Sequence, residues 1–188
     1  MEDIRAYLTQ FVAMNEEEWS ALSYCFRKQI LSKKSYLLRE GEICDFVAFI
    51  HDGAFRYYHV KEGVEKVTGF FFPQNTVSDY SSFLSQTPSR HFIEAIADST
   101  VYKLYKRDLL ELYDRFPTIE RIGRLVAEGL FLSVDKRLNS FLFMSPEERY
   151  HELVSRNPQL VQQVPQYMIA SYLGVEPETL SRIRRRNR

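Results

Sequence analysis

The spacing of hydrophobic positions changes along the chain and divides it into a helical start, a strand-rich middle and a helical remainder. Residues 4–26 carry apolar side chains at helical spacing, and Asn15 before three glutamates is typical of a helix N-cap. Residues 29–77 contain short apolar runs broken by glycine, aspartate and proline. Three of these runs predict strands joined by tight turns, namely 46–50, 54–60 and 66–72 with turns at 51–53 and 61–63. Such evenly spaced turns favour an antiparallel barrel or double-sheet roll.

After residue 105 the helical pattern returns, and residues 118–144 predict one helix about 40 Å long. Its apolar residues cover more than one stripe, whereas a lone amphipathic surface helix needs only one. Gly123 and Gly129 are unfavourable inside a helix unless something packs closely against them. A second copy of the same helix would account for both features, so we predict a homodimer. Ser145, followed by proline and two glutamates, marks the start of the next helix.

Two short apolar sets at helical spacing flank Gly174 near the C-terminus, which predicts two helices that meet at a corner. Gly174 can adopt a positive φ without a Cβ penalty, and Ala170 is small enough for the second helix to cross close by. Pro177 fits the first position of the second helix because an N–H is not needed there. On that helix Glu178 and Arg182 lie four residues apart and therefore share one face.

The second helix of this pair carries side chains suited to duplex DNA. A carboxylate at Glu178 can accept a hydrogen bond from cytosine, the guanidinium of Arg182 can donate two to guanine, and the arginines that follow suit phosphates. The alternative is a helical hairpin with a solvated basic tail, in which Glu178 and Arg182 form an ordinary ion pair. The combination of small residue, glycine, proline start and basic end favours DNA. The residues that we assign to DNA contact are Gln166, Tyr167, Pro177, Glu178, Thr179, Arg182, Arg185 and Arg186.

The charge distribution supports a polyanionic partner even though the formal net charge is zero. From Arg156 onward the chain has six arginines and two glutamates, a net charge of +4, so the remainder carries −4. This polarity would direct the C-terminal part toward DNA and keep the rest away from it.

Several other function classes are disfavoured by the sequence. No apolar run has the length of a membrane span, and the first residues do not read as a secretory signal, so we expect a cytoplasmic protein with no membrane partner. Cys25 and Cys44 do not form a CxxC pair, and the four histidines are scattered, which argues against a metal site and a cupin-like metalloenzyme. There is also no glycine-rich phosphate loop and no nucleophile elbow. We therefore expect that the protein is not an enzyme, and these residues identify no certain cofactor.

Glu178, Thr179 and Arg182 stand where the Crp/Fnr family of bacterial transcription regulators carries a Glu-Thr and a downstream Arg, and the chain resembles that family. The turn at Gly41-Glu42, which precedes a strand ending in an Asp-Gly hairpin, resembles the family's cyclic-nucleotide-binding fold. The resemblance implies an α+β chain with an N-terminal antiparallel β-roll and flanking helices, a long dimerisation helix and a C-terminal helix-turn-helix. The domains expected from it are 1–116, 117–144 and 145–188.

The same resemblance also shows departures from the family pattern. The residue before Glu178 is Pro177, where the family often has arginine or serine, so we expect a different DNA sequence to be recognised. The usual β-wing is expected to be missing, since the sequence stops at Arg188.

The ligand pocket of the family departs most from the pattern. Members that bind a cyclic nucleotide contact it with a Gly-Glu pair and with an Arg-Ser or Arg-Ala pair. This chain has Ser78-Asp79 in place of Gly-Glu. At the position of the family's arginine it has Ser89, and Arg90 follows one residue later. A loop shift could restore Arg90, which could equally be a surface residue. We therefore favour a remodelled pocket that takes another small molecule or none. The candidate effector residues are Ser78, Asp79, Tyr80, Ser89 and Arg90.

These observations predict a homodimeric regulator that binds double-stranded DNA at a near-palindromic operator, with RNA polymerase as the further partner that the resemblance implies. Two-fold symmetry would place the half-sites about 34 Å apart. A small-molecule effector in the roll would control the regulator by shifting its conformational population. The competing interpretation is a ligand-binding signalling module that acts through protein–protein contacts.

Overall fold

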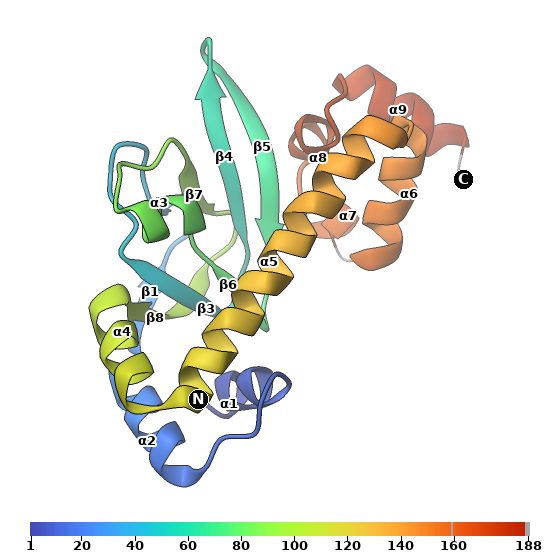
Figure 1. Ribbon diagram of the computed structural model, residues 1–188. Helices are drawn as coiled ribbons and strands as arrows, with labels where there is room; N and C mark the ends of the chain where they lie inside the picture. The colour runs from blue at the N-terminus through green and yellow to red at the C-terminus, as the bar shows by residue number, and fades with distance from the viewer. Residues whose placement is uncertain (159, 187–188) are drawn as a thin grey trace. The chain divides into compact units, whose positions relative to one another are not determined.

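The structure, a computed structural model, describes residues 1–158 and 160–186 (Figure 1). The chain forms two compact units. The first consists of Met1–Tyr57 and Phe70–Glu128, and the second of Tyr58–Gly69 with the chain from Gly129 onward. The long helix and one β-hairpin therefore each contribute to both units.

The strands of the described chain form two four-stranded sheets, in the orders β1-β8-β3-β6 and β2-β7-β4-β5. Their bounds are β1 Arg27–Leu31, β2 Tyr36–Leu38, β3 Phe46–Asp52, β4 Phe55–Lys61, β5 Val64–Phe71, β6 Asn75–Val77, β7 Phe92–Ala95 and β8 Ser99–Tyr105. The pairs β1–β8, β3–β8, β3–β6 and β2–β7 are antiparallel. The predicted roll and its three predicted strands, which correspond to β3, β4 and β5, are confirmed.

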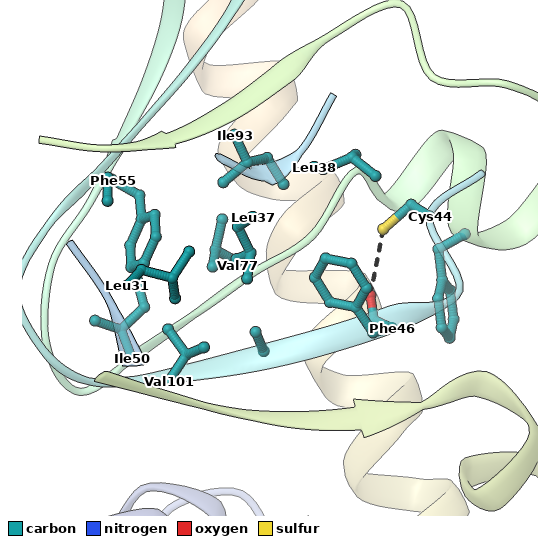
Figure 2. Close-up of a cluster of buried hydrophobic side chains, with 13 residues drawn as sticks. Leu31, Leu37, Leu38, Cys44, Phe46, Ile50, Phe55, Val77, Ile93 and Val101 are labelled. Carbon is teal, nitrogen blue, oxygen red and sulfur yellow. Dashed lines mark hydrogen bonds between the residues drawn. The ribbon is translucent and has the colours of Figure 1, made fainter. Parts of the chain in front are cut away.

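The core of the roll lies between the two sheets, because both sheets contribute to one buried cluster. Leu31, Ile50 and Val101 come from the first sheet, and Phe55 and Ile93 come from the second (Figure 2). Side chains alternate along a strand, so every second residue of a strand points into this core, and short apolar runs are enough to fill it.

Helices cover the roll through a second buried cluster. It joins α1 (Glu2–Thr9), α2 (Glu16–Cys25), α4 (Lys106–Arg115) and the first part of α5 (Pro117–Phe143), with Leu22, Leu112 and Ile119 among its members. Helix α2 begins at a capping box in which Asn15 Oδ1 accepts from the Glu18 N–H at 2.9 Å, and Glu18 accepts in return at 2.8 Å. The predicted cap at Asn15 is confirmed.

The two glycines of α5 have different surroundings. A Cβ at Gly123 would lie 1.8 Å from the Tyr113 hydroxyl, so α4 of the same chain packs against this glycine. Gly129 has nothing within 4 Å of such a Cβ. The proposed second copy is therefore not needed to explain Gly123.

The second unit contains the remaining helices and the tip of the β4–β5 hairpin. These helices are α6 (Pro146–Arg156), α7 (Leu160–Gln163), α8 (Gln166–Leu173) and α9 (Pro177–Arg186), and a six-residue α3 (Tyr80–Ser85) lies in the first unit. Helix α6 starts at the predicted Ser145 cap, whose hydroxyl accepts from the Glu148 N–H at 3.3 Å. Leu160, Ile169, Leu173 and Leu180 are buried together with their neighbours on these helices.

Candidate nucleic-acid interface

Helices α8 and α9 meet at the predicted corner. Gly174 has φ 68° and ψ 37°, the left-handed conformation that glycine adopts at low cost, and it ends α8. The Val175 N–H then donates to Ala170 O at 3.0 Å, which closes the C-terminal turn of α8. Helix α9 begins at Pro177, and the Leu180 N–H donates to Glu176 O at 3.1 Å.

One face of α9 is buried and the opposite face is open. Leu180 and Ile183 are 0% and 6% exposed and hold the helix against its unit. Since a helix turns about 100° per residue, Glu178, Arg182 and Arg185 fall within about 60° of one another on the other side. All three are exposed. The structure thus brings together the side chains that the sequence assigns to bases and to phosphate.

The open face contains further detail. Arg182 Nη2 donates to Thr179 Oγ1 at 3.1 Å, and no ion pair joins Arg182 to Glu178 among the residues described. The ordinary i,i+4 ion pair is therefore not formed here. Ser181 is exposed beside Glu178 and Arg182 and was missed by sequence reasoning, although its i+3 spacing from Glu178 places it on this face.

The remaining predicted DNA contacts are also accessible. Gln166 and Tyr167 begin α8 and are exposed, Tyr167 by 55%. Pro177 and Arg186 are exposed at the two ends of α9. Arg188, the last arginine of the basic tail, lies outside the described residues.

The corner is supported by α5 and α6, which the sequence did not indicate. A Cβ added at Gly174 would lie 2.9 Å from Phe141 Cε1, so α5 packs directly against the turn. Arg149 is 9% exposed, and its Nε and Nη2 donate to Leu173 O at 3.3 and 2.9 Å. Arg137 donates to Tyr172 O, so two arginines satisfy carbonyls at the C-terminal end of α8.

A serine of α8 joins this helix to the β4–β5 hairpin. Ser171 Oγ accepts from the Val67 N–H at 3.0 Å and donates to Glu65 O at 3.2 Å. Both partners lie on β5 within the second unit. The first of the two predicted reader helices is thus hydrogen-bonded to a strand that continues into the roll.

In the first unit, Asp79 takes the central place among the predicted effector residues. It is 3% exposed and caps α3, where its Oδ1 accepts from the Ser82 N–H at 3.3 Å. Its Oδ2 accepts from Ser89 Oγ at 2.6 Å and lies 3.6 Å from His91 Nδ1. Burial alone would raise the pKa of Asp79, but the hydrogen bonds from His91 and Ser89 hold it well below its usual range.

Tyr57 completes this cluster. Its ring stacks on His91 with centroids 4.3 Å apart. Burial, followed by the charge of Asp79, raises the pKa of Tyr57, which keeps its hydroxyl a hydrogen-bond donor to the carboxylate. The polar groups that converge here therefore already point at the Asp79 carboxylate, and an incoming phosphate would meet its buried negative charge.

The other predicted effector residues are arranged around this carboxylate or away from it. Ser78 Oγ donates to Phe46 O at 2.8 Å, and the Tyr80 ring stacks on Phe83 with centroids 5.7 Å apart. Arg90 is exposed while its neighbour Ser89 is buried. The structure thus brings Asp79 and Ser89 together and leaves Arg90 on the surface.

A buried ion pair in the roll was also missed from the sequence. Arg56 on β4 donates through Nε and Nη2 to Glu94 Oε2 on β7, at 3.1 and 2.7 Å. The two residues are 5% and 7% exposed. Strict alternation does not anticipate this pair, because Phe55 and Arg56 are consecutive and both buried.

Neither a metal cluster nor a membrane-crossing helix is found among the residues that the structure describes. Within the part of the chain that the structure describes, no group of three or more His, Cys, Asp or Glu side chains could hold a metal ion. Among residues 1–158 and 160–186, no helix combines the length and apolar character that a membrane crossing requires.

Comparison with known proteins agrees with this architecture. Residues 28–116 match the cyclic nucleotide-binding domain family. No curated protein sequence shows significant similarity to the chain. Among solved structures, FixK2 from Bradyrhizobium japonicum superposes with a TM-score of 0.74 at 18% identity, over 86% of this chain and 83% of that one.

Two other solved structures cover almost all of the chain. A protein of Eubacterium rectale described as a transcriptional regulator of the crp/fnr family has a TM-score of 0.72 at 16% identity, over 96% of this chain and 87% of that one. The catabolite activator protein of Thermus thermophilus has a TM-score of 0.60 at 20% identity, over 96% and 85%. At these identities the likeness establishes the fold, and the predicted α+β architecture is confirmed.

Proposed function

We propose that this chain is a transcription regulator that binds DNA as a homodimer. Its residues 28–116 match the cyclic nucleotide-binding domain, and its fold is that of the Crp/Fnr regulators. The observation that carries the proposal is the open face of α9. Glu178, Arg182 and Arg185 stand together there, opposite the buried Leu180 and Ile183. A helix presented in this way can enter the major groove with its first turns on base edges.

The division of roles on this face follows from position and chemistry. Glu178 and Arg182 lie near the start of α9, where a recognition helix contacts base edges. Arg185 and Arg186 lie in its last turn and suit the phosphate backbone. Gln166 and Tyr167, at the exposed start of α8, suit a second backbone contact.

Dimerisation is supported by an exposed apolar stripe on α5. Phe131, Val134, Leu138 and Leu142 follow helical spacing and are 69%, 60%, 57% and 63% exposed. A monomer rarely leaves such a contiguous apolar face in water. A second copy of α5 would bury the stripe in an isologous two-fold contact, and two copies of α9 would then read half-sites about 34 Å apart.

A cyclic nucleotide does not fit the role of effector well in this roll. The buried carboxylate of Asp79 accepts a hydrogen bond from Ser89 and lies beside His91 and Tyr57. A cyclic phosphate would have to displace this carboxylate or lie beside it, and both cost electrostatic free energy. An effector in the roll would therefore have to leave the Asp79 cluster in place.

The test is DNA binding by the full chain, measured by fluorescence anisotropy. A duplex selected by the protein from a random pool is compared with a duplex of random sequence. We expect Arg182→Ala to weaken binding to the selected duplex by about tenfold or more while binding to the random duplex changes little, because a base contact is lost. Arg185→Ala should weaken both and reduce the slope of log K against log salt by about one.

Arg107→Ala is the matched control, since Arg107 is an exposed arginine of α4 with 84% of its side chain accessible. It should leave both duplexes unaffected. Equal losses on the two duplexes for Arg182→Ala would contradict the assigned roles. If the protein selects no duplex from the pool and does not bind the random duplex, the competing signalling module that acts through protein–protein contacts is supported instead.

A further inference from the structure

A cavity of about 340 Å³ lies in the second unit among α5, α6 and α8. Its wall has a strong excess of positive charge. Lys136 and Arg137 come from α5, Arg149 and Arg156 come from α6, and Glu152 is the one carboxylate among the described lining residues. The cavity therefore carries a net charge of +3 from these groups.

Glu152 forms ion pairs with only two of the four described cations of this cavity. Lys136 Nζ lies 2.6 Å and Arg156 Nη2 lies 3.2 Å from Glu152 Oε1. Arg137 and Arg149 have no carboxylate partner in the described part of the chain and donate instead to backbone carbonyls of α8 and to Met144 O. Arg149 is buried and Arg137 is half-buried, and both lack an ionic partner among the described residues, so an anion entering the cavity would gain from their charge.

The guanidiniums are held in place by aromatic rings. Arg137 lies 3.6 Å from the Tyr172 ring centroid and 4.4 Å from that of Phe141, and Arg149 lies 4.8 Å from Phe141. Burial lowers the pKa of Arg137, and the neighbouring charge of Arg149 lowers it further. The two guanidiniums therefore lie beside the same Phe141 ring and repel one another.

We propose that this cavity binds a small phosphate monoester. Such a ligand carries a charge close to −2 at neutral pH and several acceptor oxygens, which match planar guanidinium groups and a lysine at the rim. The volume is near the lower end of the roughly 300–1,000 Å³ that small-molecule sites occupy, so the alcohol part of the ester must be small. Asn157 and Ser133 line the wall and can accept or donate hydrogen bonds to it.

The cavity stays accessible in the dimer proposed above. At about 100° per residue, Lys136, Ser140 and Ser133 lie on the side of α5 opposite Leu138 and Phe131, which belong to the apolar stripe. A second copy packed on that stripe leaves this side open. The binding site is also separate from the Asp79 cluster, and the proposal does not depend on DNA binding.

Isothermal titration of the full chain with glycerol 3-phosphate at fixed ionic strength tests the proposal. Malonate and sulfate are the comparison anions. We expect saturable binding of glycerol 3-phosphate that is at least about tenfold tighter than that of either comparison anion, because neither combines a tetrahedral dianion with an alcohol part. Absence of saturable binding up to about 10 mM, or equal binding of all three anions, would overturn it.

Variants then locate the site. Lys136→Gln should weaken binding roughly tenfold, and Glu152→Gln should tighten it because the competing carboxylate is lost. Arg124→Gln is the matched control, since Arg124 is a cation of α5 in an exposed ion pair outside the cavity. Melting temperatures establish that each variant is folded. A loss for Arg124→Gln equal to that for Lys136→Gln, or weaker binding by Glu152→Gln, would refute the assignment.

Discussion

Replacing Asp79 by asparagine tests whether the buried carboxylate holds together the part of the roll around α3. The side chain is 3% exposed, accepts hydrogen bonds from Ser82 and Ser89, and has His91 and Tyr57 as further neighbours, His91 Nδ1 at 3.6 Å. The amide keeps the shape but loses the charge, and its NH₂ group would face donors rather than accept from them. Hydrogen bonds to charged groups contribute about 1.5–3 kcal/mol each, and asparagine retains part of the network, so we expect a loss of about 3 kcal/mol in unfolding free energy at pH 7.

The depressed pKa of Asp79 decides how the stability difference between the wild type and the variant changes with pH. The folded pKa of Asp79 is depressed, so the ionised carboxylate stabilises the fold above the unfolded pKa of about 3.9, and this stability is lost as the pH falls toward the folded pKa. The difference between the wild type and Asp79→Asn should therefore shrink as the pH is lowered from about 5 to about 2. Urea denaturation followed by circular dichroism at several pH values measures it.

The control for this experiment is Asp114→Asn on α4. Asp114 is exposed, so its substitution should change the unfolding free energy by no more than about 0.5 kcal/mol at any pH. The reasoning fails if Asp79→Asn costs less than about 1 kcal/mol at pH 7, or if its cost does not depend on pH.

Two further substitutions test the dimer and the corner. Leu138→Glu should make the protein monomeric in light scattering without lowering the stability of the monomer, because this side chain is 57% exposed in one chain. Ser133→Glu, on the opposite side of α5, should leave the dimer intact. Equal effects of the two substitutions would exclude the stripe as the interface. Gly174→Ala should lower the unfolding free energy by about 1–2 kcal/mol because of its positive φ, and further because the new Cβ clashes with Phe141. Gly63→Ala, with φ +76° and no neighbour within 4 Å, should show the cost of the positive φ alone. If both variants lose the same stability in thermal unfolding, Phe141 does not press on the corner.

Elements with local signals were predictable from the sequence. Asn15 and Ser145 cap helices because each is followed three residues later by a glutamate that completes a capping box. Gly174 and Pro177 fix the corner because one needs a positive φ and the other needs no N–H. These choices depend on neighbours in the chain, so one sequence suffices to recognise them.

Elements that depend on distant partners could not be predicted. Tyr113 fills the space above Gly123, and Arg56 pairs with Glu94 across the sheet, but nothing near these residues in the chain indicates either contact. From the sequence, Asp79 could be interpreted only as a shortened glutamate, whereas its role in the fold comes from partners on two other segments, residues 89–91 and β4. Long-range packing decides such cases, and periodicity carries no information about it.

The contacts around the corner explain how a change in α5 would reach the open face of α9, which we propose reads DNA. Phe141 packs against Gly174, Arg137 donates to Tyr172 O, and the α6 residue Arg149 donates to Leu173 O. All these contacts fall on the last residues of α8 or on the turn itself, where the C-terminal carbonyls of a helix need partners. A rotation or shift of α5 would therefore alter the partners of these carbonyls before it altered the packing of α9. Since the apolar stripe and the cationic cavity lie on opposite sides of the same part of α5, pairing of two chains and binding of an anion would both act on this one corner.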